Sequence, residues 1–227
     1  MGPEIFGLQR YKSFKPTNES MKKIKNLVFD FGGVLYNIDI QRTTFALNQL
    51  QIPVNYNLNQ NDNIFFQLER GEIDSGAFLK ELNDSSPLNP GILRVKEAFL
   101  KILVGMPLES YRFLRRLSRF YSCYLLSNTN EIHYQHFYKE ITSSLSYRDF
   151  YSSFVKEYYS FKIGMRKPDI AIFNYLINDS GIKVEESLFI DDDRNNISSA
   201  EKLGFNCFNF AVDGVWSDLI AQYDLEI

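Results

Sequence analysis

The sequence is poor in cysteine and histidine, the residues that build disulfide frameworks and zinc sites. Among its 227 residues are two cysteines, Cys123 and Cys207, and two histidines, His133 and His136. Each cysteine lies in an apolar run typical of a strand, so we expect buried free thiols rather than a disulfide, a metal site or a nucleophile. Both histidines fall on one predicted helix without neighbours at zinc-ligand spacing, and we assign them no role.

The sequence also lacks a strong excess of either charge and any long apolar segment. Its 25 Lys and Arg against 28 Asp and Glu give a formal net charge of -3, which provides no general attraction to nucleic acid or acidic membranes. No apolar stretch is long enough to span a bilayer, and the N-terminus lacks the apolar core of a secretory signal. We therefore expect a cytoplasmic protein that binds neither nucleic acid nor membranes.

The length suits one domain core with a modest insertion. A hydrophobic fraction of 44% and a charged fraction of 23% are ordinary for a globular protein. Residues 1–20 show no periodicity, and we expect them to be an N-terminal extension. The residues leave open whether this extension is a natural arm, the result of an upstream start or an expression remnant.

Strands and helices alternate along most of the chain, which predicts an α/β fold with a parallel sheet and helices on both faces. A first apolar strand, 24–29, is followed by helical runs without a convincing strand, so we expect residues 39–104 to be an inserted all-helical cap. Residues 21–38 and 105–227 would form the core. The helical runs expected in the cap are 41–50, 63–70, 75–82 and 92–103; the core strands expected after it are 121–126, 158–161, 187–190 and 206–210, and its helices are 108–120, 131–141, 169–178 and 195–203.

Reactive side chains follow the predicted strands, at the sheet edge where parallel α/β proteins bind ligands. Asp30 follows the first strand, and Gly32 and Gly33 come next. An aspartate here could simply cap a turn. The glycines favour a site instead, because they allow the backbone to approach closely and leave the Gly32 carbonyl free to bind a cation.

Three consecutive carboxylates, Asp191 to Asp193, follow the strand at 187–190. Their mutual repulsion should raise some pKa values or require a cation. We interpret Asp191 and Asp192 as part of a Mg²⁺ site, with Asn196 one helical turn away as a support. Asp193 fits better as a member of a solvated turn.

Lys167 and Ser127 complete the set. Lys167 lies in "GMRKPD", where we expect Pro168 at the first position of a helix. Two cations at a helix start, Arg166 and Lys167, are unfavourable unless an anion compensates, although an exposed pair is an equally simple interpretation. Ser127 is followed by a capping pattern from Asn128 to Glu131, so we expect Asn128 or Asn130 to cap the next helix. A hydroxyl beside a helix start could also hold phosphate.

In this order, "FDFGGVL", "LLSNTN", "GMRKPD" and "FIDDDRNN" resemble the four motifs of the haloacid dehalogenase (HAD) superfamily. The resemblance covers the chain from Met21 onward and implies a Rossmann-like core. The insert resembles that superfamily's C1-type cap, and the motif wording is most similar to the branch containing bacterial glucose 1-phosphate phosphatases. The resemblance implies a magnesium-dependent phosphatase of small phosphate monoesters, with sugar phosphates as one candidate class.

The resemblance also implies roles for individual residues. Asp30 would attack phosphorus, and Ser127, Asn128 and Lys167 would bind the phosphoryl group, with Lys167 neutralising charge. Asp30, the Gly32 carbonyl and Asp192 would bind Mg²⁺, supported by Asp191 and Asn196. Such chemistry depends on positioning and on cations that offset oxygen charge.

One position departs from the family pattern: many of its phosphatases have an acid-base Asp where this chain has Gly32. General acid-base catalysis is worth roughly 10²–10⁴-fold in rate. A non-catalytic phosphate-binding module is therefore one alternative function, and a hydrolytic dehalogenase of the same superfamily is another, although dehalogenases need no metal and would not use the acidic pair. The oligomeric state is left open.

The resemblance bears on two further features. Phe65, Phe66 and Glu69 are candidates to line the cap's entrance, although a Phe pair at helical spacing often belongs to a core. If the sheet has the family's strand order, two strands separate those of Cys123 and Cys207, so the thiols lie roughly 14 Å apart at about 4.8 Å per strand, too far for a disulfide.

Overall fold

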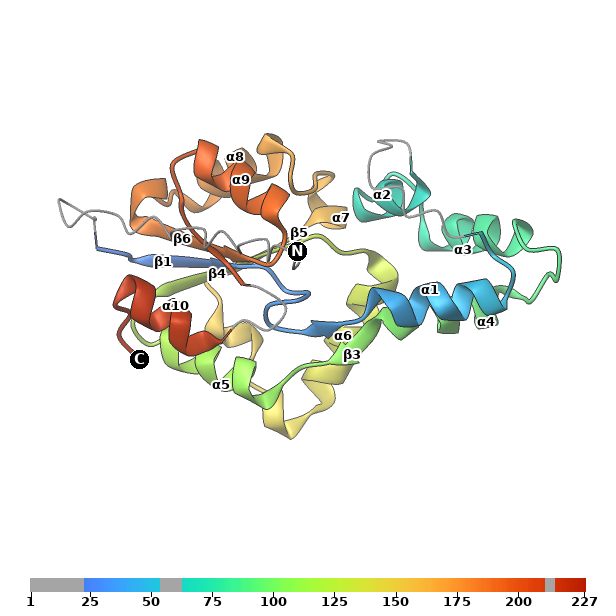
Figure 1. The fold of residues 1–227 in the computed structure, drawn as a ribbon, viewed down its shortest axis with the longest axis horizontal. Helices are drawn as coiled ribbons and strands as arrows, with labels where there is room; N and C mark the ends of the chain where they lie inside the picture. Colours follow the sequence, from blue (N-terminus) through green and yellow to red (C-terminus); the bar gives the residue numbers. More distant parts are fainter. Residues whose placement is uncertain (1–22, 54–62, 211–214) are drawn as a thin grey trace, which may run out of the picture.

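The computed structural model describes residues 23–53, 63–210 and 215–227. The expected N-terminal extension, 1–20, lies outside these ranges. A five-stranded parallel sheet forms the centre of the molecule in the order β5-β4-β1-β6-β7 (Figure 1). The strands are β1 (Asn26–Phe29), β4 (Ser122–Ser127), β5 (Lys156–Tyr159), β6 (Ser187–Asp191) and β7 (Asn206–Asn209).

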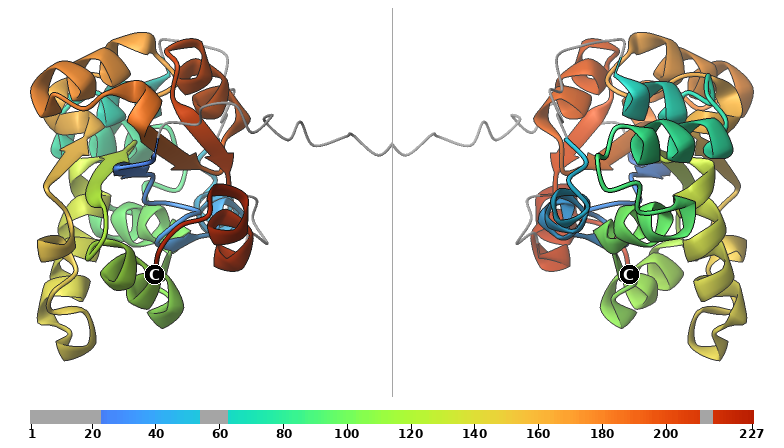
Figure 2. Two further views of the ribbon diagram at one scale, coloured as in Figure 1. Left: turned by 90° about the vertical axis from the view of Figure 1, so that its left-hand side faces the viewer. Right: turned by 90° about the vertical axis from the view of Figure 1, so that its right-hand side faces the viewer.

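Helices cover both faces of this sheet, as predicted, and Figure 2 shows the two layers from the sides. Alternate residues of β1 face opposite cores: Leu27 and Phe29 pack with one helix layer and Val28 with the other. All three are fully buried, as expected for a strand between two helix layers. One layer contains α5 (Leu108–Leu117), α6 (Glu131–Ser143) and α10 (Trp216–Tyr223); the other contains α8 (Ile170–Ser180) and α9 (Arg194–Lys202).

The helices that extend to one side of the core in Figure 1 are called the cap here. They are α1 (Ile40–Gln49), α2 (Ile64–Glu69), α3 (Ser75–Asp84) and α4 (Ile92–Phe99). Phe78, Val95 and Phe99 are among the residues of its own hydrophobic cluster, which Ile132 of the core helix α6 joins. The cap thus has a separate core that is packed against the main one.

Two short antiparallel strands, β2 (Asn37–Ile38) and β3 (Leu103–Gly105), connect the cap to the core. The prediction of a helix over 92–103 was wrong at its end, because α4 stops at Phe99 and a 3-10 turn, Leu100–Ile102, leads into β3. The Asp39 amide donates to the Ile102 carbonyl at 2.8 Å. Strands of two and three residues are too short to show an alternation of apolar and polar residues, so the sequence gives no local signal for them.

Smaller differences occur around the third motif. β5 ends at Tyr159, and Ser160 and Phe161, predicted as strand, begin the short helix α7 (Ser160–Ile163). The Lys167–Pro168 bond is cis, and Asp169 is the N-cap of α8, so the expectation of Pro168 as first helical residue was wrong. Three further 3-10 turns are Leu145–Tyr147, Tyr151–Ser153 and Val184–Glu186.

Both cysteines are free, as expected, but Cys207 is only partly buried. Cys123 lies on β4 and Cys207 on β7, and β1 and β6 separate those strands. In the described ranges, no helix is long and apolar enough to span a bilayer.

Candidate active site

The sheet register brings the acidic residues of the first and last motifs together. Phe29 of β1 is paired with Ile190 of β6, so Asp30 and Asp191 leave the same edge of the sheet as neighbours. Carboxylate oxygens of Asp30, Asp191 and Asp192 all lie within 4.8 Å of one another. All three residues follow apolar runs of the sequence that were predicted as strands, and the fold joins them in one cluster.

Lys167 is the cation of this cluster. Its side chain is fully buried, and Nζ lies 2.8 Å from Asp30 Oδ1 and 2.7 Å from Asp191 Oδ2. The alternative of an exposed Lys-Arg pair is therefore wrong for Lys167. Burial opposes the charged ammonium, but the carboxylates of Asp191 and Asp30 outweigh it and raise the pKa of Lys167.

One ammonium does not balance three carboxylates. Burial raises the pKa of Asp30 to about 7, although Lys167 opposes that shift. Burial, followed by the charge of Asp191, raises the pKa of Asp192 to about 6. Two ionised carboxylates at 4.8 Å repel each other by roughly 3.5 kcal/mol at an effective dielectric constant of about 20. The cluster therefore favours an additional positive charge.

Neighbouring groups hold Asp191 in place. Asn196 donates from Nδ2 to Asp191 Oδ1 at 3.0 Å and to Oδ2 at 3.1 Å, and the Asp193 amide donates to Oδ1 at 2.8 Å. The Asp193 side chain is exposed and caps α9 by accepting from the Asn195 amide. Asp193 thus belongs to a solvated cap, as expected, and Asn196 acts on Asp191.

The glycines after Asp30 leave room for the Asp192 carboxylate and leave a backbone carbonyl free. Gly33 has φ +81°, and a Cβ there would lie 2.2 Å from Asp192 Oδ2. Any side chain at this position would therefore collide with the Asp192 carboxylate. Within the described ranges, no hydrogen bond ends on the Gly32 carbonyl, which leaves that oxygen available to a cation.

Ser127 and Asn128 follow β4, and the structure gives Asn128 a function that the sequence analysis missed. Ser127 is buried at the end of the strand. Asn128 accepts from the Lys167 amide and donates to the Lys167 carbonyl, both at 2.8 Å. Of the two expected cap residues, Asn128 and Asn130, it is Asn130 that caps α6. Asn128 instead holds the backbone of Lys167.

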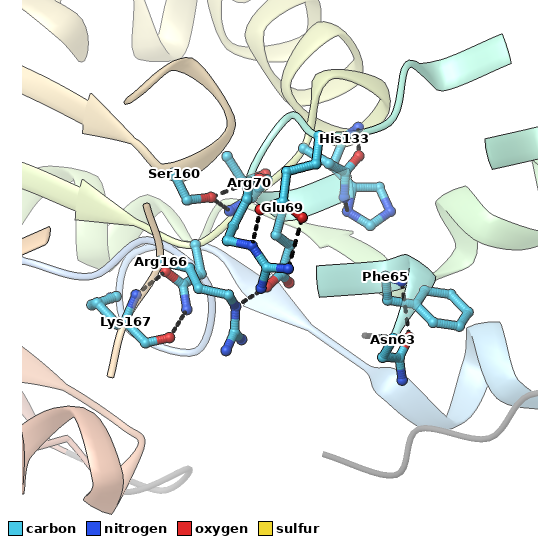
Figure 3. A network of polar contacts seen from close by, with 12 residues as sticks. Asn63, Phe65, Glu69, Arg70, His133, Ser160, Arg166 and Lys167 are labelled. Atoms are coloured by element: carbon cyan, nitrogen blue, oxygen red, sulfur yellow. Dashed lines mark hydrogen bonds and ion pairs between the residues drawn. The ribbon is translucent and has the colours of Figure 1, made fainter. Parts of the chain in front are cut away.

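A cavity of about 230 Å³ lies next to this cluster, lined by residues of the core that neighbour the cluster in sequence and by residues of the cap. The core contributes Gly32, Ser127 and Arg166 to its lining, and Phe66 and Glu69 are among the residues from the cap. Phe65 also lines the cavity and packs edge-on against Phe78. It therefore has both roles expected for the Phe pair, lining the site and packing in a core. Arg166 extends from the Lys167 segment to Glu69 (Figure 3).

His133, to which we assigned no role, joins the core to the cap. Its ring stacks on Phe99 of α4 with centroids 4.3 Å apart. Asn130 Nδ2 lies 2.9 Å from Nδ1, and Nε2 lies 3.3 Å from the Phe99 carbonyl oxygen. Because the Asn130 amide donates to Nδ1, the proton is on Nε2. Burial lowers the pKa of His133 to about 4, which keeps the ring neutral.

The residues present fit a magnesium ion. Mg²⁺ prefers oxygen ligands and usually takes one or two carboxylates from the protein. Asp30 and Asp192 provide carboxylates with raised pKa values beside the free Gly32 carbonyl. A divalent cation there would offset the charge that Lys167 leaves unbalanced.

Comparisons with known proteins agree with this geometry. Residues 24–204 match the haloacid dehalogenase-like hydrolase family model. D-ribitol-5-phosphate phosphatase of Bacteroides thetaiotaomicron is 32% identical over 193 residues, 82% of this chain and 91% of the relative.

Two solved structures are also similar. A HAD family enzyme of B. thetaiotaomicron in complex with magnesium and inorganic phosphate has a TM-score of 0.77 and 32% identity, covering 86% of this chain and 98% of that one. A HAD-like family hydrolase of Porphyromonas gingivalis has a TM-score of 0.78 and 30% identity, covering 91% and 100%. With the family model covering most of its length, this chain belongs to the haloacid dehalogenase-like hydrolase family.

Proposed function

We propose that this protein is a magnesium-dependent phosphatase of small phosphate monoesters and that Asp30 carries the phosphoryl group during turnover. One observation carries the proposal: the buried Lys167 ammonium lies between Asp30 and Asp191, with Asp192 in the same cluster. Phosphoryl transfer needs a positioned nucleophile and positive charge around the phosphate oxygens. Asp30 is the positioned nucleophile of this cluster. Lys167 provides one positive charge, and the remaining carboxylates favour the binding of a cation that would provide more.

In the proposed reaction, an Asp30 carboxylate oxygen attacks phosphorus as the bond to the leaving alcohol breaks. Water then hydrolyses the aspartyl phosphate, which releases phosphate and restores the carboxylate. Lys167 offsets the charge of the phosphoryl oxygens, and the Ser127 hydroxyl binds one of them. Asn128 keeps Lys167 in place through both of its backbone hydrogen bonds.

Asp30, the Gly32 carbonyl and Asp192 would hold Mg²⁺, and Asp191 and Asn196 would support that site. When bound, the ion neutralises developing charge on the phosphoryl group. Burial raises the pKa values of Asp30 and Asp192, which supports this assignment, because a bound cation would favour the ionised carboxylates that burial disfavours.

The substrate class we propose is a small phosphorylated metabolite, with sugar or polyol phosphates as the leading candidates. The cavity of about 230 Å³ is smaller than the ~300–1,000 Å³ of typical drug-sized sites. The similar protein from B. thetaiotaomicron is named for its action on D-ribitol 5-phosphate. We also infer that residues 39–104 form a C1-type cap on a core of 21–38 and 105–227, in the branch that contains glucose 1-phosphate phosphatases.

Gly32 supports a second candidate, a phosphate-binding module without turnover, because it offers the leaving oxygen no acid. A phosphate-release screen across sugar and polyol phosphates separates the two. The phosphatase proposal predicts release that EDTA abolishes and that Asp30→Asn lowers by roughly three orders of magnitude or more. Stabilisation by phosphate without any release would favour the binding module. Metal-independent release that survives Asp30→Asn would reject the mechanism.

A further inference from the structure

The cavity lining contains one pair of opposite charges. Among the described residues that line it, only Glu69 and Arg166 are charged. Glu69 is the last residue of the cap helix α2, and Arg166 directly precedes Lys167 in the core. Arg166 Nε donates to Glu69 Oε2 at 2.8 Å (Figure 3). Both members of the pair therefore line the same cavity as Ser127, Glu69 from the cap and Arg166 from the core.

The ion pair is largely removed from solvent and contacts an aromatic ring. The side chains of Arg166 and Glu69 are 16% and 25% exposed. The Arg166 guanidinium carbon lies over the Phe66 ring, 3.9 Å from its centroid, a cation–π contact. Figure 3 shows the Arg166 and Glu69 side chains pointing toward each other.

This pair has unused hydrogen-bonding groups. In the ranges that the structure describes, neither the Nη groups of Arg166 nor Oε1 of Glu69 makes a hydrogen bond. Among the described residues, neither the Nη atoms of Arg166 nor Oε1 of Glu69 is a fully buried atom without a partner, so these atoms are accessible to a ligand in the cavity. A donor beside an acceptor is complementary to a hydroxyl group, which both accepts and donates. A chain of hydroxyls would satisfy both side chains at once.

The opposite charges of Glu69 and Arg166 also affect which substrates bind. A second phosphate or a carboxylate on the substrate would be attracted by Arg166 and repelled by Glu69, so the pair gives no advantage to an additional anion. We propose that Glu69 and Arg166 recognise hydroxyl groups of the leaving group, so that the site selects uncharged polyol phosphates. This inference rests on the proposed phosphatase function and assigns its specificity to two residues.

A purely structural role, tying the cap to the core, is the competing explanation. Other contacts already make that connection: Ser75 Oγ donates to Glu131 Oε2 at 2.9 Å, and His133 stacks on Phe99. If the pair only ties the cap to the core, its loss should lower kcat/KM for all substrates by the same factor. If it recognises hydroxyls, its loss should change the ratio of kcat/KM between substrates with and without hydroxyls.

The test compares kcat/KM for a pentitol phosphate, for pentyl phosphate, which has the same carbon chain without hydroxyls, and for phosphoglycerate, which carries a carboxylate. Glu69→Gln and Arg166→Gln are measured beside Glu72→Gln. Glu72 is a matched control, because it is an exposed cap carboxylate paired with Arg70 and does not line the cavity.

Loss of a hydrogen bond to a charged group is expected to lower the pentitol-to-pentyl ratio about tenfold or more in both cavity variants. Glu69→Gln is also expected to raise the phosphoglycerate-to-pentitol ratio, since it leaves Arg166 free to attract the carboxylate. Glu72→Gln should leave both ratios within about twofold of the unmodified protein, the range expected for an exposed ion pair.

Unchanged ratios in the cavity variants would overturn the inference, even if overall activity falls because the cap is loosened. If the unmodified protein releases phosphate from sugar phosphates in the wider screen but from none of these three esters, this inference fails and the proposed function stands. If it releases phosphate from no ester in either experiment, both fail.

Discussion

Removing the negative charge of Asp192 should stabilise the metal-free protein and abolish its response to magnesium. Asp192→Asn relieves the repulsion from Asp30 and Asp191, whose carboxylate oxygens lie within 4.8 Å. That repulsion is roughly 3.5 kcal/mol for a fully ionised pair. Partial exposure of Asp192 and the charge of Lys167 reduce it, so we expect a gain of about 1 kcal/mol in the free energy of unfolding.

The assay is thermal unfolding in EDTA and in magnesium. For a domain of this size, 1 kcal/mol shifts Tm by about 2–4 °C, which is the increase expected for Asp192→Asn in EDTA. Magnesium at about 100 times its Kd stabilises the folded state by about 2.7 kcal/mol. The unmodified protein should therefore gain about 5–11 °C, and Asp192→Asn should gain less than about 2 °C.

Asp193→Asn is the matched control. It makes the same charge change one residue away, but Asp193 is exposed and caps α9, a position where asparagine is an equally good residue. This variant should keep the full magnesium response. If Asp192→Asn keeps it too, or if it destabilises the metal-free protein, the proposed sharing of one cation between Asp30 and Asp192 is refuted.

Two further predictions follow from the same cluster. Because burial raises the pKa of Asp30 to about 7 and of Asp192 to about 6, the folded, metal-free protein holds protons that the unfolded chain releases above about pH 4. In EDTA, Tm should fall as pH rises from about 4 to about 7, and saturating magnesium should remove most of this fall; a Tm that rises over this interval in EDTA would contradict it. Lys167→Met leaves two buried carboxylates without their cation and should cost about 3 kcal/mol or more in urea denaturation, whereas Lys156→Met, which breaks an exposed pair, should cost less than about 1 kcal/mol. Equal losses in the two lysine variants would show that Lys167 does not neutralise the cluster.

The cluster itself could be predicted from the sequence because of a general property of parallel sheets. Their strands end at one edge, so side chains that follow separate apolar runs meet there. Asp30 and Asp191 are neighbours for this reason, because the residues before them, Phe29 and Ile190, are paired in the sheet. The burial of Lys167 did not follow from its motif alone, which an exposed Lys-Arg pair explains equally well; its contacts with Asp30 and Asp191 decide it.

Contacts that depend on the relative position of cap and core could not be predicted in this way. Nothing local in the sequence indicates that His133 stacks on Phe99, or that Arg166 reaches Glu69 across 97 positions of the chain. The contacts of Asn128 were missed for a related reason. Its capping pattern is local, but the buried backbone of Lys167 offers it both a donor and an acceptor, and that long-range pairing is the one formed.

The central claim, that Asp30 accepts the phosphoryl group, can be tested most directly by stopping the reaction with acid during turnover of a polyol phosphate and locating the bound phosphate by peptide mass spectrometry. We predict phosphate on Asp30 in the presence of magnesium and none when EDTA is added first. Phosphate on Ser127 or any other residue, or magnesium-dependent turnover in a protein whose Asp30 is replaced by Asn, would contradict the account.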